Sequence, residues 1–208
     1  MANISAMKDP TAYLAPQHIS KMIEGEPVLR NKLIIRLLFR GGMRVSELCN
    51  IEVRNILWDE DCIIIPWMKR RRKEGQPPLM RKIPLDSGTL DMIQEYLSWR
   101  EKYHVDNHNR RLIPLDRRMV YWIVRRAAER VGIFRVGSPN SIHNHPHPHT
   151  LRHSYATWRV AKTGGDYGKL RKVQLDMGHA DINTTASYLA VDGKELHREY
   201  DKAFEELD

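Results

Sequence analysis

The sequence lacks the features that mark secreted and membrane proteins. Only two of its 208 residues are cysteine, Cys49 and Cys62, which is too few for a disulfide scaffold and agrees with a reducing compartment. Apolar runs such as residues 62–68 fall far short of the ~18 residues that cross a bilayer, and no apolar segment follows a basic start at the N-terminus. We therefore expect a cytoplasmic protein without a membrane partner, in which both cysteines are small buried side chains.

Negative charge is the scarcer of the two signs. Lysine and arginine number 34 against 26 acidic residues, which gives a formal net charge of +8, the balance expected of a nucleic-acid-binding protein. Residues 69–82 hold seven of the basic residues and a single acid, Glu74, so much of the surplus lies in one segment. Because a charged run is more often a solvated face than a site, composition alone raises nucleic-acid binding only as a hypothesis.

The spacing of apolar residues predicts a mainly helical chain with one small sheet in its N-terminal third. Residues 56–58 and 62–65, joined by an acidic turn, indicate a β-hairpin, and residues 81–85 indicate a third strand. Helices are expected from Pro16, over 27–39, from Val45, and at about 87–103, 117–132, 149–163, 168–178, 182–190 and 194–207.

These elements predict an α+β fold, mainly α with a three-stranded antiparallel sheet. We expect one domain over residues 13–192, preceded by a flexible leader at 1–12 and followed by an amphipathic helix at 193–208. That helix is otherwise acidic and carries one apolar stripe, formed by Leu196, Tyr200, Ala203, Phe204 and Leu207. Packing of this stripe against the protein's own core is the default expectation.

Histidines crowd the segment between residues 143 and 153. Imidazole binds zinc and nickel, so a metal site is one interpretation of their alternation. Prolines interleave with three of them, no cysteine or carboxylate lies nearby, and no spacing matches a structural zinc site. We therefore expect no metal, and we interpret His143, His145 and His147 as a polar loop before a helix.

A basic edge is expected at the start of the helix over 149–163. His149, Arg152 and His153 lie three or four positions apart, so their side chains share one edge. That edge combines imidazole and guanidinium near a helix N-terminus, whose free N–H groups favour anions. It indicates a phosphate-binding arrangement, and an ordinary basic surface is the alternative.

Two further segments carry side chains suited to phosphate chemistry. Arg44 follows the pair Gly41-Gly42, and Glu47, three residues on, can hold its guanidinium in one orientation. Near the other end of the chain a glycine breaks a helix and presents His179, and Tyr188 follows nine residues later. An ordinary half-buried aromatic residue is the alternative interpretation of Tyr188.

Three signatures in this order and spacing resemble the tyrosine recombinase family, of the phage-integrase and Xer type. They are GMRVSEL at 42–48, PHTLRHSYAT at 148–157 and MGHADINTTASY at 177–188. The resemblance covers about residues 13–208 and implies the catalytic-domain fold of that family. It also implies site-specific recombination or integration, double-stranded DNA as the partner, a homodimer or tetramer on DNA, and no cofactor.

The resemblance implies a role for each of five side chains. Tyr188 would attack the scissile phosphate, form a 3′-phosphotyrosyl bond and release a 5′-hydroxyl, without metal or ATP. Arg44 and Arg152 would stabilise the charge on the non-bridging oxygens as fixed forks. His149 is the general-base candidate, because the tyrosine hydroxyl must lose a proton, and His179 would donate a hydrogen bond.

The family supplies the proton for the leaving oxygen from a lysine between the second and third strands. Here the usual short, glycine-containing turn is replaced by a longer basic segment. Counting from the hairpin favours Lys69 and counting back from residues 83–85 favours Lys73; we favour Lys69 and keep Lys73 as the alternative. The remaining basic residues are expected to contact DNA phosphates: Arg70, Arg71, Arg72, Lys73, Arg81 and Lys82.

The two ends of the chain also bear on the interpretation. Family members usually carry an N-terminal core-binding domain that clamps the opposite side of the DNA, and we expect it to be absent here, since about a dozen residues precede the catalytic domain. The resemblance further implies that the helix at 193–208 docks on a neighbouring protomer. The competing functions are relaxation of DNA by a type IB topoisomerase-like activity and a non-catalytic DNA-binding protein on the same fold.

Overall fold

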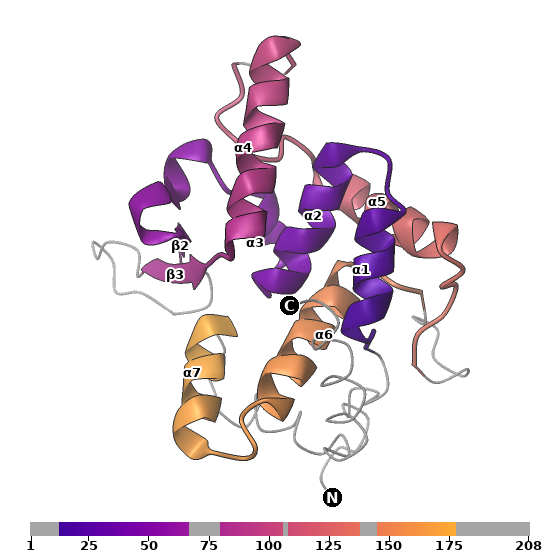
Figure 1. Cartoon of the computed structure of the whole chain (residues 1–208), viewed down its shortest axis with the longest axis vertical. Helices are drawn as coiled ribbons and strands as arrows, with labels where there is room; N and C mark the ends of the chain where they lie inside the picture. The colour runs from indigo at the N-terminus through magenta and orange to yellow at the C-terminus, as the bar shows by residue number, and fades with distance from the viewer. Residues whose placement is uncertain (1–12, 67–79, 106–107, 138–144, 178–208) are drawn as a thin grey trace, which may run out of the picture.

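The computed structural model describes residues 13–66, 80–105, 108–137 and 145–177 (Figure 1). The described ranges contain three strands: β1 (Ile56–Leu57), β2 (Cys62–Pro66) and β3 (Met80–Pro84). The helices are α1 (Pro16–Glu24), α2 (Leu29–Arg40), α3 (Val45–Cys49), α4 (Ser87–Lys102), α5 (Arg117–Arg130), α6 (Pro148–Ala161) and α7 (Tyr167–Met177). The expected mainly helical fold with one small antiparallel sheet is thereby confirmed.

The sheet has the order β1-β2-β3, and both pairs of neighbouring strands are antiparallel. Ile63 in β2 pairs with Ile56 on one side and Ile83 on the other. The first strand ends one residue earlier than expected, because Trp58–Glu60 form a 3₁₀ turn. Asp61 then adopts a left-handed conformation with φ 48°, which reverses the chain into β2.

Helix α2 lies at the centre of the fold and packs against α1, α4, α5 and α6 (Figure 1). Because it has neighbours on several sides, its apolar residues are buried around most of the helix rather than along one stripe. Removing each such side chain from water stabilises the fold by about 1.5–3 kcal/mol. The side chains with 0% exposure are Leu33, Ile34, Ile35, Leu37 and Leu38.

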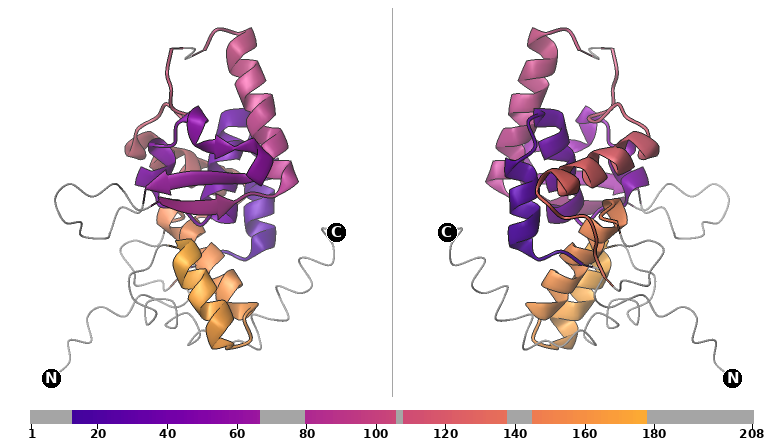
Figure 2. Two further views of the ribbon diagram at one scale, coloured as in Figure 1. Left: turned by 90° about the vertical axis from the view of Figure 1, so that its left-hand side faces the viewer. Right: turned by 90° about the vertical axis from the view of Figure 1, so that its right-hand side faces the viewer.

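Helices α6 and α7 extend from one side of this core and α4 from the other, with the sheet between them (Figures 1 and 2). Both α6 and β3 contact α7. The end of α7 lies close to the sheet, because Arg81 in β3 donates a hydrogen bond to the carbonyl oxygen of Asp176. Cys49 and Cys62 are buried, as expected, and burial raises the pKa of both thiols. None of the helices in the described ranges has the length and apolar composition of a membrane span.

Several expected segments lie outside the described residues. They are the leader at 1–12, the two helices expected at 182–190 and 194–207, and the C-terminal segment at 193–208. The basic segment at 67–79 does so as well.

Candidate active site

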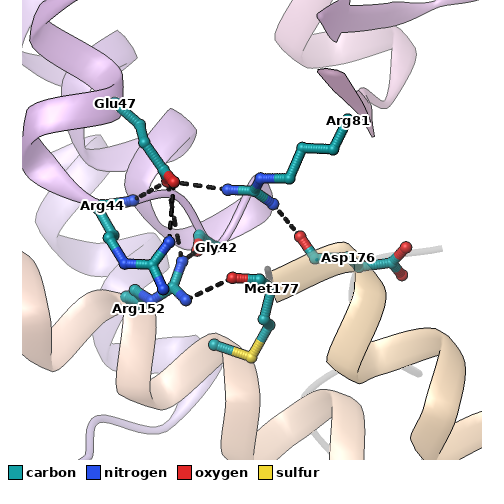
Figure 3. A network of polar contacts seen from close by, with 7 residues as sticks. All are labelled: Gly42, Arg44, Glu47, Arg81, Arg152, Asp176 and Met177. Carbon is teal, nitrogen blue, oxygen red and sulfur yellow. Dashed lines mark hydrogen bonds and ion pairs between the residues drawn. The ribbon is translucent and has the colours of Figure 1, made fainter. Parts of the chain in front are cut away.

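Three segments far apart in the sequence meet around one carboxylate. Glu47 in α3 is the centre, and the guanidinium groups of Arg44, Arg81 and Arg152 approach it from the start of α3, from β3 and from α6 (Figure 3). The Glu47 side chain is only 1% exposed. A buried carboxylate needs compensating partners, and these arginines supply them.

Glu47 fixes Arg44 through two contacts. Its Oε2 accepts a hydrogen bond from the backbone N–H of Arg44 at 2.6 Å, and its Oε1 accepts one from Arg44 Nη1 at 2.9 Å. The first contact caps α3 and the second orients the guanidinium. The structure therefore contains the Arg44–Glu47 contact that the three-residue spacing led us to expect.

Arg152 lies in the same cluster and is held mainly by backbone carbonyls. Its Nη2 donates to the carbonyl oxygen of Met177 at 2.6 Å, and its Nη1 donates to that of Gly42. The same Nη1 lies 4.0 Å from Glu47 Oε2. The Arg152 side chain thus connects the turn before α3 with the end of α7, and it brings a second guanidinium next to Arg44 (Figure 3).

The buried position of Arg81 contradicts the expectation that it contacts DNA at the protein surface. It is only 6% exposed, its Nη2 donates to Glu47 Oε2 at 2.8 Å, and its Nη1 donates to the carbonyl oxygen of Asp176. Burial lowers the pKa of Arg81. The alternation of β3 carried a signal for this position, because Arg81 shares a strand face with the buried Ile83.

Lys82 lies on the other face of β3. Its side chain is 55% exposed and forms an ion pair with Glu60. This position agrees with an accessible basic residue, whereas Arg81 belongs to the interior of the site.

The expected basic edge of α6 is divided by packing. His149 is exposed, but Arg152 and His153 are buried, because α6 packs against α2, α5 and α7. The alternative interpretation, an ordinary basic surface shared by all three residues, is therefore wrong. His149 and Arg152 instead face different surroundings, one an open cavity and the other the interior cluster.

His149 lines a cavity of about 560 Å³ at the starts of α3, α5 and α6. Val45, the residue after Arg44, lines the same cavity. The other lining residues come from the starts of α5 and α6: Asp116, Arg117, Arg118, Tyr121, His147 and Pro148. An anion in this cavity would therefore meet basic side chains from the starts of two helices, α5 and α6.

The remaining histidines of this segment make ordinary polar contacts where they are described. His145 Nδ1 lies 2.9 Å from the carbonyl oxygen of Phe134, and the His147 ring contacts the Thr150 hydroxyl. Among the described residues, histidine, cysteine and carboxylate side chains form no group of three that could hold a metal ion. His143 lies outside those residues.

Several of the expected site residues also lie outside the described ranges, so their roles stay predictions. They are Lys69, Arg70, Arg71, Arg72, Lys73, His179 and Tyr188.

Comparison with known proteins identifies relatives of this chain. The model of the phage integrase family matches residues 13–195. Tyrosine recombinase XerA of Pyrococcus horikoshii is 30% identical over 194 residues, which cover 91% of this chain and 60% of the relative. The chain thus spans about three fifths of the length of this curated relative.

Solved structures share the fold. A crystal structure of XerA recombinase has a TM-score of 0.68 at 24% identity and covers 97% of this chain and 65% of its own, which shows the fold alone. XerH site-specific recombinase bound to a palindromic difH substrate, in a post-cleavage complex, also has a TM-score of 0.68, at 26% identity. That match covers 94% of this chain and 54% of the XerH chain.

Proposed function

The chain belongs to the phage integrase family, and on this premise we propose that it is a site-specific DNA recombinase that breaks and rejoins strands through a 3′-phosphotyrosyl intermediate. The observation that carries the proposal is that the guanidinium groups of Arg44 and Arg152 lie next to each other beside Glu47. In this proposal residues 13–192 form the catalytic domain, and neither metal nor ATP takes part.

The paired arginines suit the charge that the reaction develops. Attack on a phosphodiester passes through a pentacovalent arrangement with added negative charge on the non-bridging oxygens, and preorganised donors stabilise that charge. Arg44 and Arg152 are both held by hydrogen bonds, so little reorganisation is needed when a phosphate arrives. A lysine would present a point charge instead of a fixed fork.

His149 is the proposed general base and Tyr188 the proposed nucleophile. Tyrosine has an ordinary pKa of about 10, so its hydroxyl needs a proton acceptor during attack. The position of His149 supports this role, because its side chain is exposed and lines a cavity together with Val45, the residue after Arg44. His179 is the proposed hydrogen-bond donor, and it follows Met177, which contacts Arg152, by two positions.

The basic segment between β2 and β3 supplies the remaining roles in this proposal. Lys69, with Lys73 as the alternative, gives a proton to the leaving 5′-oxygen. The arginines at 70–72 and Lys82 contact DNA phosphates, and the exposure of Lys82 supports its part. Arg81 is not among the proposed DNA contacts, because its side chain is buried.

DNA is the proposed partner, and a homodimer or tetramer is the proposed assembly on it. The acidic, apolar-striped segment at 194–208 would dock on a neighbouring protomer. Removing residues 194–208 should then prevent assembly on DNA in sedimentation measurements. Unchanged assembly would contradict docking on a neighbouring protomer.

The central test is a covalent complex with nicked DNA. The DNA is a duplex recovered by selection from a random-sequence library and nicked next to the cleavage position. It should trap the protein through a covalent bond between Tyr188 and the 3′-phosphate of the cleaved strand. Tyr188→Phe should abolish the complex and leave DNA affinity unchanged. A complex that persists in Tyr188→Phe would overturn the nucleophile, and supercoil relaxation without strand exchange would favour the topoisomerase-like alternative.

A further inference from the structure

Arg81 is a buried cation that the proposed chemistry leaves without a task. It lies on β3, its side chain is 4% exposed, and it reaches both Glu47 and the end of α7. Bringing a third guanidinium into this cluster costs desolvation free energy, so its position calls for a physical explanation.

The two oxygens of Glu47 are divided unequally among the arginines. Oε1 accepts from Arg44 Nη1 at 2.9 Å, whereas Oε2 accepts from the Arg44 backbone N–H at 2.6 Å and from Arg81 Nη2 at 2.8 Å, and lies 4.0 Å from Arg152 Nη1. Oε2 therefore lies between two guanidinium groups, and of these two it is Arg81 that forms a hydrogen bond with it. Because a buried carboxylate requires a charged partner, losing Arg81 would draw Oε2 toward Arg152.

The second contact of Arg81 keeps this division in place. Its Nη1 is bound to the Asp176 carbonyl oxygen at the end of α7, next to Met177, whose carbonyl holds Arg152 (Figure 3). A guanidinium that is hydrogen-bonded through both of its Nη atoms cannot follow Glu47 toward Arg152. Arg81 thus fixes the carboxylate from the side opposite to the catalytic pair.

We propose that Arg81 is a positioning residue that holds Glu47 away from Arg152 and so preserves the charge of Arg152 for a phosphate. This inference rests on the proposed function, because it assumes that Arg152 binds a phosphate. Arg81 acts through Glu47 in this scheme and does not touch the DNA.

The test measures binding of inorganic phosphate by titration calorimetry at constant ionic strength. Arg81→Met, which removes the charge and keeps much of the volume, should weaken phosphate binding about five-fold or more, because Glu47 then pairs with Arg152. Adding Glu47→Gln to Arg81→Met should recover part of the loss, since the competing charge is gone, although the single oxygen of Gln keeps only one of the two hydrogen bonds to Arg44. A merely structural role for Arg81 predicts the opposite, that the double variant binds no better than Arg81→Met.

Arg100→Met is the matched control. Arg100 is 5% exposed, in α4, and donates to backbone carbonyls including that of Arg111 at 2.9 Å. Its loss removes the same charge from an equally buried position away from Glu47. We expect lower thermal stability but phosphate affinity within about two-fold of wild type, because no charge at the cluster changes.

Each outcome decides between the two proposals. Phosphate binding that is absent in the wild-type protein would overturn the proposed phosphate site itself. Wild-type binding together with no recovery in the Arg81→Met, Glu47→Gln protein would overturn the role of Arg81 alone. If Arg81→Met does not fold, Arg81→Lys decides: affinity within about two-fold of wild type supports the charge argument, and a ten-fold loss overturns it.

Discussion

Gly42 packs directly against the aromatic ring of Tyr155, so closely that a side-chain carbon at position 42 would overlap the ring. Gly42 also has φ +54°, in the left-handed region that favours glycine. Its carbonyl oxygen accepts a hydrogen bond from Arg152, and Arg44 follows two residues later. This close approach of the turn before α3 to α6 therefore brings the two arginines together.

Replacing Gly42 by alanine should destabilise the protein strongly. The left-handed conformation costs about 1–2 kcal/mol for a residue with a Cβ, and the overlap with Tyr155 adds about 1–3 kcal/mol. Gly164→Ala is the matched control, because Gly164 has φ +58° and no atom within 4 Å of an added Cβ. Urea unfolding should show a clearly larger loss for Gly42→Ala; equal losses would contradict the packing argument.

Arg152→Lys should slow cleavage while leaving DNA binding nearly intact. Lysine cannot hold the carbonyls of Gly42 and Met177 and present a fork to the phosphate at the same time, so single-turnover cleavage should fall about 100-fold or more. Arg159→Lys changes the same residue type two turns along α6, where Arg159 pairs with Asp176 at 2.7 Å. Its cleavage rate should stay within about two-fold of wild type, and similar losses in both variants would count against a special role for Arg152.

Stability should fall on acidification through the titration of Asp86. Burial acts to raise the pKa of Asp86, but hydrogen bonds from Arg36 and Thr89 outweigh it, and the pKa is lowered from its ordinary value of 3.8. Because the folded protein holds this carboxylate ionised, its contribution is complete above that value and is lost as the pH falls below it.

Asp86→Asn isolates that charge. Asparagine still caps the start of α4, so the variant should lose about 1 kcal/mol at neutral pH through the Arg36 contact, which is 2.5 Å in the wild type. Urea midpoints from pH 2 to 7 should show a flatter acid limb in Asp86→Asn. An acid limb as steep as that of wild type would exclude Asp86 as its source.

DNA affinity should depend on salt through the basic segment between β2 and β3. Each phosphate contact on a duplex contributes about −0.9 to the log–log slope of affinity against salt, so glutamine at the three arginines 70–72 should make the slope shallower by about 2.7. Fluorescence anisotropy with labelled duplex at several salt concentrations measures this. An unchanged slope would mean that these arginines do not contact the backbone.

Some features of the site could be predicted because they are local in the chain. The Arg44–Glu47 contact spans three residues of one helix start, so the spacing alone indicated it. The spans of α4, α5 and α6 follow from apolar periodicity in the same way, with ends that differ by one or two residues. Local geometry decides such features, and the residue order contains it.

The partners of Arg81 and Arg152 depended on how the elements pack. Arg81 was expected to contact DNA, although the alternation of β3 could have placed it on the inward face, and only the docking of the sheet against α3 and α7 gave it Glu47 and the Asp176 carbonyl as partners. Likewise, helical spacing put His149 and Arg152 on one edge of α6, and the packing of α2, α5 and α7 left one exposed and buried the other.

By itself, the amino-acid sequence determined the helices and strands, the basic character and the residues available for phosphate chemistry. The tertiary structure alone decided that Arg81 and Arg152 join Arg44 around the Glu47 carboxylate, and at what distance. The physical reason is that these contacts join segments separated by tens of residues, whose approach depends on core packing and on a glycine that lets two backbones come close.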